Sequence, residues 1–215
     1  MPSPDHRQLL AGAEALHTPL TAEQAEQLLA YLGLLARWNK TYNLTAIRDP
    51  GQMLVQHGLD SLSVLAPLLR HSGGRPLRLL DVGSGGGLPG VVLALTRPEI
   101  AVTCVDTVGK KASFVRQVAA ELRLPNLQAR HARVETLDEP PFDVITARAF
   151  ASLADLVALT RPLLAPGGVW MAMKGQHPAD ELAALPPDID VFHVEPLAVP
   201  GLDAERCLVW MRPRH

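Results

Sequence analysis

An aspartate and a group of closely spaced glycines follow an apolar segment near the middle of the chain. The apolar segment covers residues 77–82, Asp81 is its penultimate residue, and glycines stand at positions 83, 85, 86, 87 and 90. A short aliphatic segment that ends abruptly is typical of a strand buried on both faces of a parallel sheet. A glycine turn between such a strand and a helix presents backbone N–H groups at the positive end of the helix dipole. The pattern predicts a binding loop for a nucleotide-like ligand at the carboxyl edge of a sheet.

The glycines fit two ligand classes. Gly85-x-Gly87-x-x-Gly90 matches the dinucleotide fingerprint, in which glycines let the backbone approach a pyrophosphate. Counted from the end of the strand, however, Gly83-x-Gly85-x-Gly87 follows directly after Asp81. A carboxylate at that place is awkward for a diphosphate and useful beside a cation. S-adenosylmethionine carries an ammonium and a sulfonium and no phosphate, so Asp81 favours this cofactor.

Asp106 is the second acidic residue of this pattern. It ends the aliphatic segment 100–105 and lies 23 positions after Gly83. An acidic residue at the end of the second strand, about 20 residues past the glycines, accepts hydrogen bonds from ribose hydroxyls. This serves an adenosyl or a dinucleotide ligand equally, and it is compatible with a capping role for Asp106 at the following helix.

Composition limits the class of protein. The chain has 215 residues, of which 47% are hydrophobic and 20% charged, and its net charge is −2, as expected of a soluble globular protein. No apolar segment approaches the roughly 20 residues that span a bilayer, and no signal-peptide pattern is present, so we expect a cytoplasmic protein without a membrane partner. Cys104 and Cys207 stand in apolar segments without ligand spacing, which predicts buried thiols and no metal site. Without a coiled-coil pattern, we expect a monomer.

The chain divides into two predicted parts. Residues 1–75 form a helical appendage, with an amphipathic helix over 21–38 that Thr21 and Gln24 begin as a capping box, and helical material over 52–70 broken near Gly58 and Pro67. Residues 76–215 form the second part. Its expected elements are strands at 77–82, 100–105, 127–131, 142–147, 169–174, 189–195 and 206–211, and helices at 90–96, 110–122, 152–164 and 179–185. Alternating strands and helices predict an α/β fold with a mostly parallel sheet, closed by an antiparallel hairpin.

Several motifs together carry a resemblance to a known family. They are Trp38-Asn39-Lys40-Thr41-Tyr42-Asn43-Leu44-Thr45-Ala46-Ile47, His57-Gly58-Leu59-Asp60-Ser61-Leu62, the segment 81–90, Arg148-Ala149-Phe150-Ala151 and Met173-Lys174-Gly175. The chain resembles the bacterial ribosomal RNA small-subunit methyltransferase G family, also called glucose-inhibited division protein B, from about residue 20 to its end. The resemblance implies a Rossmann-like class I methyltransferase fold with a seven-stranded sheet. It also implies S-adenosylmethionine-dependent methylation of a guanine N7 in 16S ribosomal RNA of the small ribosomal subunit.

The resemblance also assigns cofactor contacts to residues of this chain. Gly83 and Leu88 would flank the methionine part, Val134 and Glu135 would approach the adenine, and Arg148 would border the site of methyl transfer. Together with Asp81, Gly85 and Asp106 these form the predicted cofactor site. Arg148 can hold the guanine O6, a phosphate or the cofactor carboxylate, and the sequence does not choose among them.

The residues after the fourth strand favour a ring nitrogen as the methyl acceptor. An exocyclic amine methyltransferase typically places an Asp/Asn-Pro-Pro-aromatic tetrapeptide there, whereas this chain has Ala147-Arg148-Ala149-Phe150. Methylation at pyrimidine C5 would require an exposed nucleophilic cysteine, and both cysteines lie in strand patterns. Guanine N7 already presents an in-plane lone pair and needs positioning rather than a general base. We therefore assign no base, and we expect His57 to make a structural hydrogen bond.

An RNA-binding surface is not evident from charge, because no part of the chain is strongly basic. The local candidates are Lys40, Lys110, Lys111 and Lys174, with Arg37 and Arg116, and Trp38, Tyr42 and Phe150 can stack on a splayed base. Nothing in the sequence indicates a DNA partner. Three alternatives stay open: a small-molecule methyltransferase, an NAD-dependent oxidoreductase and a non-catalytic RNA-binding module.

Overall fold

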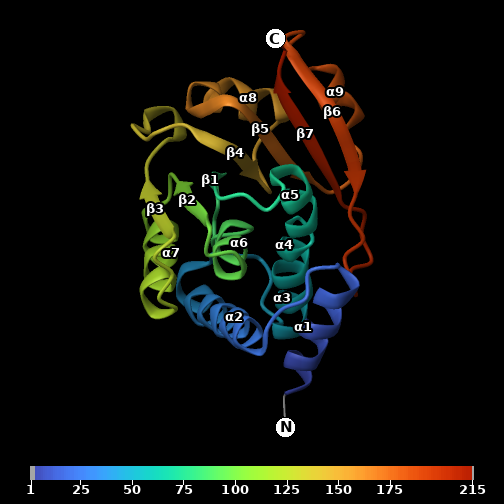
Figure 1. Cartoon of the computed structure of the whole chain (residues 1–215). Coiled ribbons are helices and arrows are strands. Elements are labelled where there is room, and N and C mark those ends of the chain that lie inside the picture. Colours follow the sequence, from blue (N-terminus) through green and yellow to red (C-terminus); the bar gives the residue numbers. More distant parts are fainter. Residues whose placement is uncertain (1–2, 215) are drawn as a thin grey trace.

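The computed structural model describes residues 3–214, and its centre is one seven-stranded sheet of order β3-β2-β1-β4-β5-β7-β6 (Figure 1). The first five strands are parallel to one another, whereas β7 is antiparallel to both β5 and β6. This confirms the predicted fold class and the closing hairpin. The strands are β1 (Leu77–Val82), β2 (Ile100–Asp106), β3 (Leu127–His131), β4 (Phe142–Ala147), β5 (Leu164–Lys174), β6 (Ile189–Pro196) and β7 (Cys207–Pro213).

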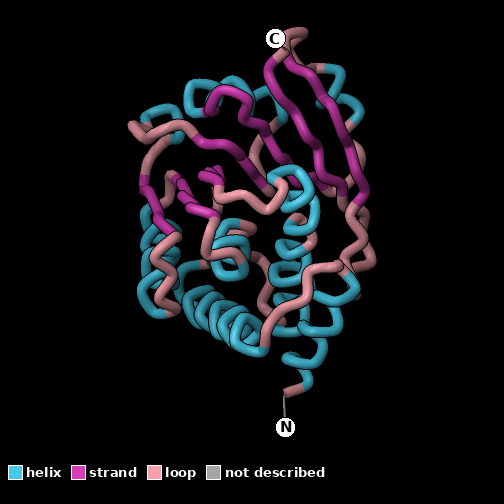
Figure 2. The backbone as a smooth tube through the Cα atoms, viewed as in Figure 1, coloured by secondary structure: helices cyan, strands magenta, loops and turns pink. Residues whose placement is uncertain are grey.

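Helices cover both faces of the sheet (Figures 1 and 2). Helices α6 (Gly90–Thr96) and α7 (Gly109–Glu121) lie on one face, and α8 (Leu153–Thr160) and α9 (Ala179–Ala183) lie on the other. Side chains alternate along a strand, so neighbouring Leu79 and Leu80 enter two different hydrophobic clusters. Burial on both faces explains why the central strands are continuously apolar in the sequence.

The N-terminal helices share the core of the sheet. They are α1 (Pro4–Ala15), α2 (Ala22–Tyr42), α3 (Pro50–Met53), α4 (Asp60–Leu62) and α5 (Leu65–Ser72). The capping box is confirmed: the Gln24 N–H donates to Thr21 Oγ1 at 3.1 Å, and the Thr21 N–H donates to Gln24 Oε1 at 3.0 Å. Leu28 of α2 and Leu79 of β1 belong to one hydrophobic cluster. A division near residue 75 stays a prediction, and this cluster extends across it.

The predicted helix break near Gly58 is wrong, whereas an interruption does fall shortly before Pro67. From α3 the chain continues through a π-helical turn, Leu54–Leu59, directly into α4, and the interruption falls before α5. Gly58 is buried against Leu32, so it serves close packing rather than a turn. Pro67 stands in the first turn of α5, where its missing N–H has no helical partner to lose.

Three further differences concern the ends of elements. Helix α1 was not predicted, although Ser3 caps it and Pro4 opens it. Helix α8 ends at Thr160, before a 3₁₀ turn at Arg161–Leu163. Strand β5 begins at Leu164 rather than at residue 169, and its pairing with β4 shifts register between Phe142 and Val144. Over the residues described, none of the helices has the length and apolar character needed to cross a membrane.

Candidate active site

The glycine loop after β1 has the backbone conformation that its sequence predicts. Gly83, Gly85 and Gly87 all have positive φ angles, of 65°, 57° and 88°. A Cβ at Gly87 would lie 2.4 Å from Val91 Cγ2, so a side chain there is excluded by strain and by contact. Gly90 has a different role, because its Cβ would lie 2.8 Å from Asp81 Oδ2. The loop therefore follows the alternating pattern counted from the strand, and Gly90 permits close packing of helix on strand.

Asp81 supports this loop from behind. Its carboxylate is fully buried, and Oδ2 accepts a hydrogen bond of 2.8 Å from the Gly90 N–H, while Oδ1 has no hydrogen-bond partner. Burial raises the pKa of Asp81 to about 7. Asp81 lines neither of the two cavities described next. Through its hydrogen bond to Gly90, the first residue of α6, Asp81 fixes the position of the glycine loop.

A cavity of about 390 Å³ lies at the carboxyl ends of β1 and β2, and we call it the strand-end cavity. Asp106 stands at its wall, where Oδ2 accepts from the Gly85 N–H at 3.0 Å and Oδ1 accepts from the Val108 N–H at 2.8 Å. These bonds fix the carboxylate and leave lone pairs for ribose hydroxyls. Residues that the sequence singled out also line it, namely Gly83, Val134, Glu135 and Phe150.

A second cavity, of about 280 Å³, lies over the glycine loop, and we call it the loop cavity. Gly83, Gly85, Leu88 and Arg148 line it, as does Lys111, which also lines the strand-end cavity. The two cavities share Gly83, Lys111 and Ala149 and so adjoin. The two adjoining cavities together offer an acidic group, apolar walls and open glycine backbone, which are groups that an adenosyl group joined to an amino acid can use.

Helix α2 forms the far wall of the loop cavity, which the sequence did not predict. The Tyr31 hydroxyl donates a hydrogen bond of 2.6 Å to the Gly86 carbonyl oxygen, and Leu35 lines the cavity beside it. Tyr31 is fully buried. A tyrosine in an amphipathic helix gives no local signal for this contact, because the pattern shows only that the position faces the core.

A third cavity, of about 310 Å³, lies beyond Arg148, and we call it the arginine cavity. Arg148 Nη1 donates to the Gln56 carbonyl oxygen at 3.0 Å and lies 3.4 Å from Asp60 Oδ2. Arg206, which precedes β7, donates from Nε to Asp60 Oδ1 at 3.0 Å. Neither Asp60 nor Arg206 was predicted as a site residue. Asp60 stands in the segment His57-Gly58-Leu59-Asp60-Ser61-Leu62 that carries part of the family resemblance, which is a signal for it, whereas no local pattern marks Arg206.

The two N-terminal motifs meet at this cavity. The Asn39 side chain donates to the Ile47 carbonyl oxygen at 3.1 Å and accepts from the Thr45 N–H at 2.9 Å, which fixes the loop after α2. Thr45 Oγ1 then lies 2.8 Å from His57 Nε2. Burial and the Arg148 charge lower the pKa of His57 to about 4, so the ring is neutral near pH 7. The structural hydrogen bond predicted for His57 is confirmed.

The predicted RNA-binding lysines fall in different places. Lys40 and Lys110 are exposed, and their contact with RNA stays a prediction. Lys111 is directed toward the cavities, with Nζ 3.9 Å from Asp106 Oδ2. Lys174 lines the arginine cavity, and its Nζ lies 2.9 and 2.7 Å from the two carboxylate oxygens of Glu181.

The three aromatic residues that were predicted to stack on a base also lie in different places. Phe150 lines the strand-end cavity. Trp38 packs on buried Phe114 with ring centroids 5.4 Å apart, whereas Tyr42 is 40% exposed. Of the three, Tyr42 is the ring that solvent reaches most readily.

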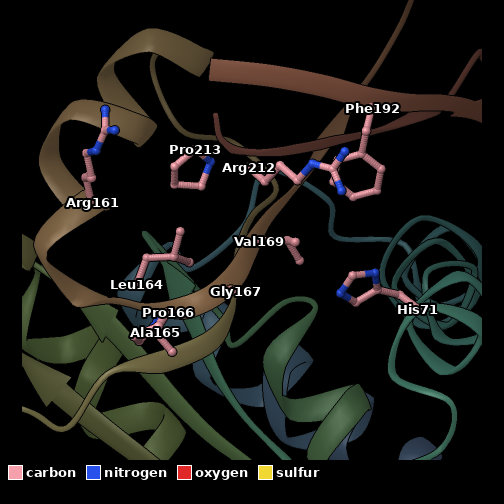
Figure 3. A pocket seen from close by; sticks show the side chains of 11 residues that line it. His71, Arg161, Leu164, Ala165, Pro166, Gly167, Val169, Phe192, Arg212 and Pro213 are labelled. Carbon is pink, nitrogen blue, oxygen red and sulfur yellow. The ribbon is translucent and has the colours of Figure 1, made fainter. Parts of the chain in front are cut away.

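Another cavity, of about 540 Å³, lies beside the first residues of β5 (Figure 3). His71, Phe192 and Arg212 line it together with the first residues of β5. Arg212 donates to Asp190 Oδ2 at 2.8 Å and lies over the Phe192 ring, so its charge is already paired. Ligands of parallel α/β sheets bind at the carboxyl ends of the strands, where the three smaller cavities lie.

Known proteins match this chain over nearly its whole length. The model of the GidB family, described as rRNA small subunit methyltransferase G, matches residues 24–209. The chain is 74% identical to Ribosomal RNA small subunit methyltransferase G of Leptothrix cholodnii, over 98% of this chain and 97% of that one. Identity to the protein of the same name from Methylibium petroleiphilum is 66%, over 93% and 90% of the two chains.

Solved structures show the same fold. TrmN from Thermus thermophilus superposes with a TM-score of 0.58 and 25% identity, covering 71% of this chain and 48% of that one. The ribosomal protein L11 methylase from Lactobacillus delbrueckii superposes with a TM-score of 0.56 and 16% identity, covering 73% and 79%. A methyltransferase family over nearly the whole chain rules against the NAD-dependent oxidoreductase. By the extent of the family match and the identity to its members, the chain belongs to the GidB family, the rRNA small subunit methyltransferases G.

Proposed function

We propose that the chain transfers a methyl group from S-adenosylmethionine to N7 of a guanine in 16S ribosomal RNA of the small ribosomal subunit. One observation carries this proposal: Arg148 and Ala149 line both the loop cavity and the arginine cavity. A donor held over the glycine loop and an acceptor held in the arginine cavity therefore meet at these two residues. The acceptor's class rests on the family.

The residues of the first two cavities have the chemistry that this cofactor needs. Asp106 would accept hydrogen bonds from the ribose, and Val134 and Glu135 would border the adenine in the strand-end cavity. Gly83, Gly85 and Leu88 would border the methionine part in the loop cavity, with Asp81 holding the loop from behind. When bound, S-adenosylmethionine supplies an electrophilic methyl group on a positively charged sulfur.

The protein groups near the acceptor support a ring nitrogen. Burial raises the pKa of the Cys104 thiol and that of the Cys207 thiol. Neither therefore offers the nucleophilic thiolate that methylation at pyrimidine C5 requires. No amine-binding tetrapeptide follows β4. Guanine N7 has a lone pair and no proton to be removed. Its methylation therefore does not require His57 to act as a base.

The work of this chain's residues is therefore alignment. Arg148 and Lys174 would hold the guanine nucleotide in the arginine cavity, and the buried walls would exclude water from the methyl group. Fixing two reactants in line is by itself a large source of acceleration, equivalent to effective concentrations of about 10⁵ M or more. We assign no general acid or base.

Exposed Lys40 and Lys110 would contact the phosphate backbone around the target. With few exposed aromatics, recognition would rest on the shape of the assembled subunit. Its substrate would place the enzyme in the cytoplasm, and we expect it to act as a monomer.

The decisive experiment is transfer of tritiated methyl groups to 30S subunits from a strain that lacks this gene, followed by nucleoside analysis. We expect label in 7-methylguanosine at one position. Naked 16S RNA and a pool of small metabolites are assayed in parallel with the 30S subunits. Label in a metabolite alone would overturn the proposal. Label on another base atom would overturn the N7 assignment, and no transfer to any substrate would favour a non-catalytic RNA-binding module. Calorimetry with S-adenosylhomocysteine and with NAD tests the cofactor, and only the former is expected to bind.

A further inference from the structure

Asp60 is a buried acid that no step of the proposed reaction uses. It is 1% exposed, and its two carboxylate oxygens pair with different arginines. Oδ2 lies 3.4 Å from Arg148 Nη1, and Oδ1 lies 3.0 Å from Arg206 Nε. A buried carboxylate is costly unless cations and hydrogen bonds compensate for lost water. Here the compensation comes from two distant segments, the end of β4 and the link between β6 and β7.

The ion pairs around the arginine cavity leave it with net positive charge. Arg148, Arg206 and Lys174 line the arginine cavity, where Asp60 pairs with both arginines and Glu181 pairs with Lys174. Three cations against two carboxylates leave one net positive charge for a ligand. The class of ligand that fits is an electron-rich nucleotide rather than a cation.

The pairs also leave N–H groups free. Within residues 3–214, the hydrogen bonds of Arg148 to protein all start from Nη1, to Gln56, His57 and Asp60. Arg206 uses Nε toward Asp60 and Nη1 toward the Glu205 carbonyl oxygen. A guanidinium has five N–H donors in a fixed plane, so fixing one side determines the direction of the other.

We propose that Asp60 is a positioning residue, which aligns Arg148 and Arg206 so that their free N–H groups meet O6 of the target guanine. The inference rests on the proposed function. Guanine presents O6 and N7 as acceptors on this edge, whereas adenine presents an N6 amine donor. Arginines aligned on O6 select guanine over adenine and leave the N7 lone pair directed at the methyl group.

The test is a double-mutant cycle of Asp60→Asn and Arg206→Gln, assayed on 30S subunits that lack the modification. We expect Asp60→Asn to lower kcat/KM about 100-fold, the cost of a misplacement of about 1 Å in an aligned site. The double variant should be no slower than the slower single variant, because Asp60 acts through the arginines. Asp203→Asn, an exposed acid in the same link, is the matched control and should keep wild-type turnover.

Binding of S-adenosylhomocysteine separates positioning from folding. We expect its Kd for Asp60→Asn to stay within a few-fold of wild type while turnover falls. Wild-type turnover in Asp60→Asn, multiplying effects in the double variant, or parallel loss of cofactor binding and turnover would each overturn the inference. If Asp60→Asn alone does not fold, the double variant, in which Arg206→Gln removes the unbalanced charge, is compared with Arg206→Gln alone. Because Asp60 also aligns Arg148, we expect a further loss of turnover in the double variant, and equal turnover would overturn the inference. Absence of 7-methylguanosine with the wild-type enzyme would instead count against the proposed function.

Discussion

The Tyr31 hydroxyl donates a hydrogen bond of 2.6 Å to the carbonyl oxygen of Gly86, and this bond joins helix α2 to the glycine loop. The glycine loop is therefore held on two sides, by Asp81 from the sheet and by Tyr31 from the N-terminal helices. Helices outside the strand–helix alternation thus belong to the site.

Replacing Tyr31 by Phe should weaken both stability and cofactor binding. The buried Gly86 carbonyl would lose its partner, at a cost of about 1–3 kcal/mol in the free energy of unfolding. Urea unfolding measures this loss, and calorimetry should show a several-fold weaker Kd for S-adenosylhomocysteine. Tyr42→Phe is the control, since Tyr42 is 40% exposed. Equal stability of the two variants would show that the Tyr31 bond contributes nothing.

Gly87→Ala should disrupt the glycine loop. Its φ of 88° disfavours alanine, and the new Cβ would lie 2.4 Å from Val91 Cγ2, so we expect a loss of about 1–3 kcal/mol and at least tenfold weaker S-adenosylhomocysteine binding. Gly33→Ala should have the opposite effect on stability, because Gly33 lies within α2 and its Cβ position has no atom within 4 Å other than those of the adjacent residues and the nearby helix backbone. There we expect a gain of about 0.5–1 kcal/mol. Thermal and urea unfolding of the two variants give the comparison.

His57 should make the protein less stable in acid. Its pKa in the folded state is about 4, below its ordinary 6.5, so below pH 6.5 the unfolded chain binds a proton that the folded chain refuses. The contribution is complete above pH 6.5 and is lost as the pH falls toward 4, up to about 3 kcal/mol. The stability of His57→Gln relative to wild type should therefore rise as the pH falls through this range. A constant difference between pH 7.5 and 4.5 would contradict the assignment.

Asp81 should give stability the opposite pH dependence. Burial raises its folded pKa to about 7, so its favourable contribution is complete below its ordinary pKa of 3.8 and is lost as the pH rises to about 7. The stability of Asp81→Asn relative to wild type should accordingly increase between pH 4 and pH 7 and level off above. Urea unfolding without cofactor, across the same pH series, measures this. A profile parallel to wild type would show that Asp81 is ionised throughout.

Two neighbouring lysines should have separate effects. Lys110 is exposed, so Lys110→Ala should weaken binding to 30S subunits and lower the slope of log affinity against log salt by about 1. Lys111 lines both the strand-end cavity and the loop cavity, so Lys111→Ala should change the Kd for S-adenosylhomocysteine instead. Filter binding across a salt series and calorimetry distinguish them. Identical behaviour of the two variants would contradict their separate placement.

The sequence predicted what depends on neighbours in the chain. The strand, the alternating glycines and the acid after the second strand are close in sequence, and local backbone preferences determine their geometry. Asp106 accordingly stands at the carboxyl edge of the sheet as predicted. The helix break predicted at Gly58 failed for the converse reason, since packing against α2 overrides local preference.

Only the tertiary structure decided what surrounds the point where the cavities meet. Asp60, Arg148 and Arg206 come from three distant segments, and no periodicity relates their positions. Their contacts exist because the N-terminal helices share a core with the sheet and because the closing hairpin returns β7 beside β5. The sequence by itself determined the glycine loop, through the steric demands of adjacent residues. The folded chain determined the arginine cavity, because long-range packing brings its charges together.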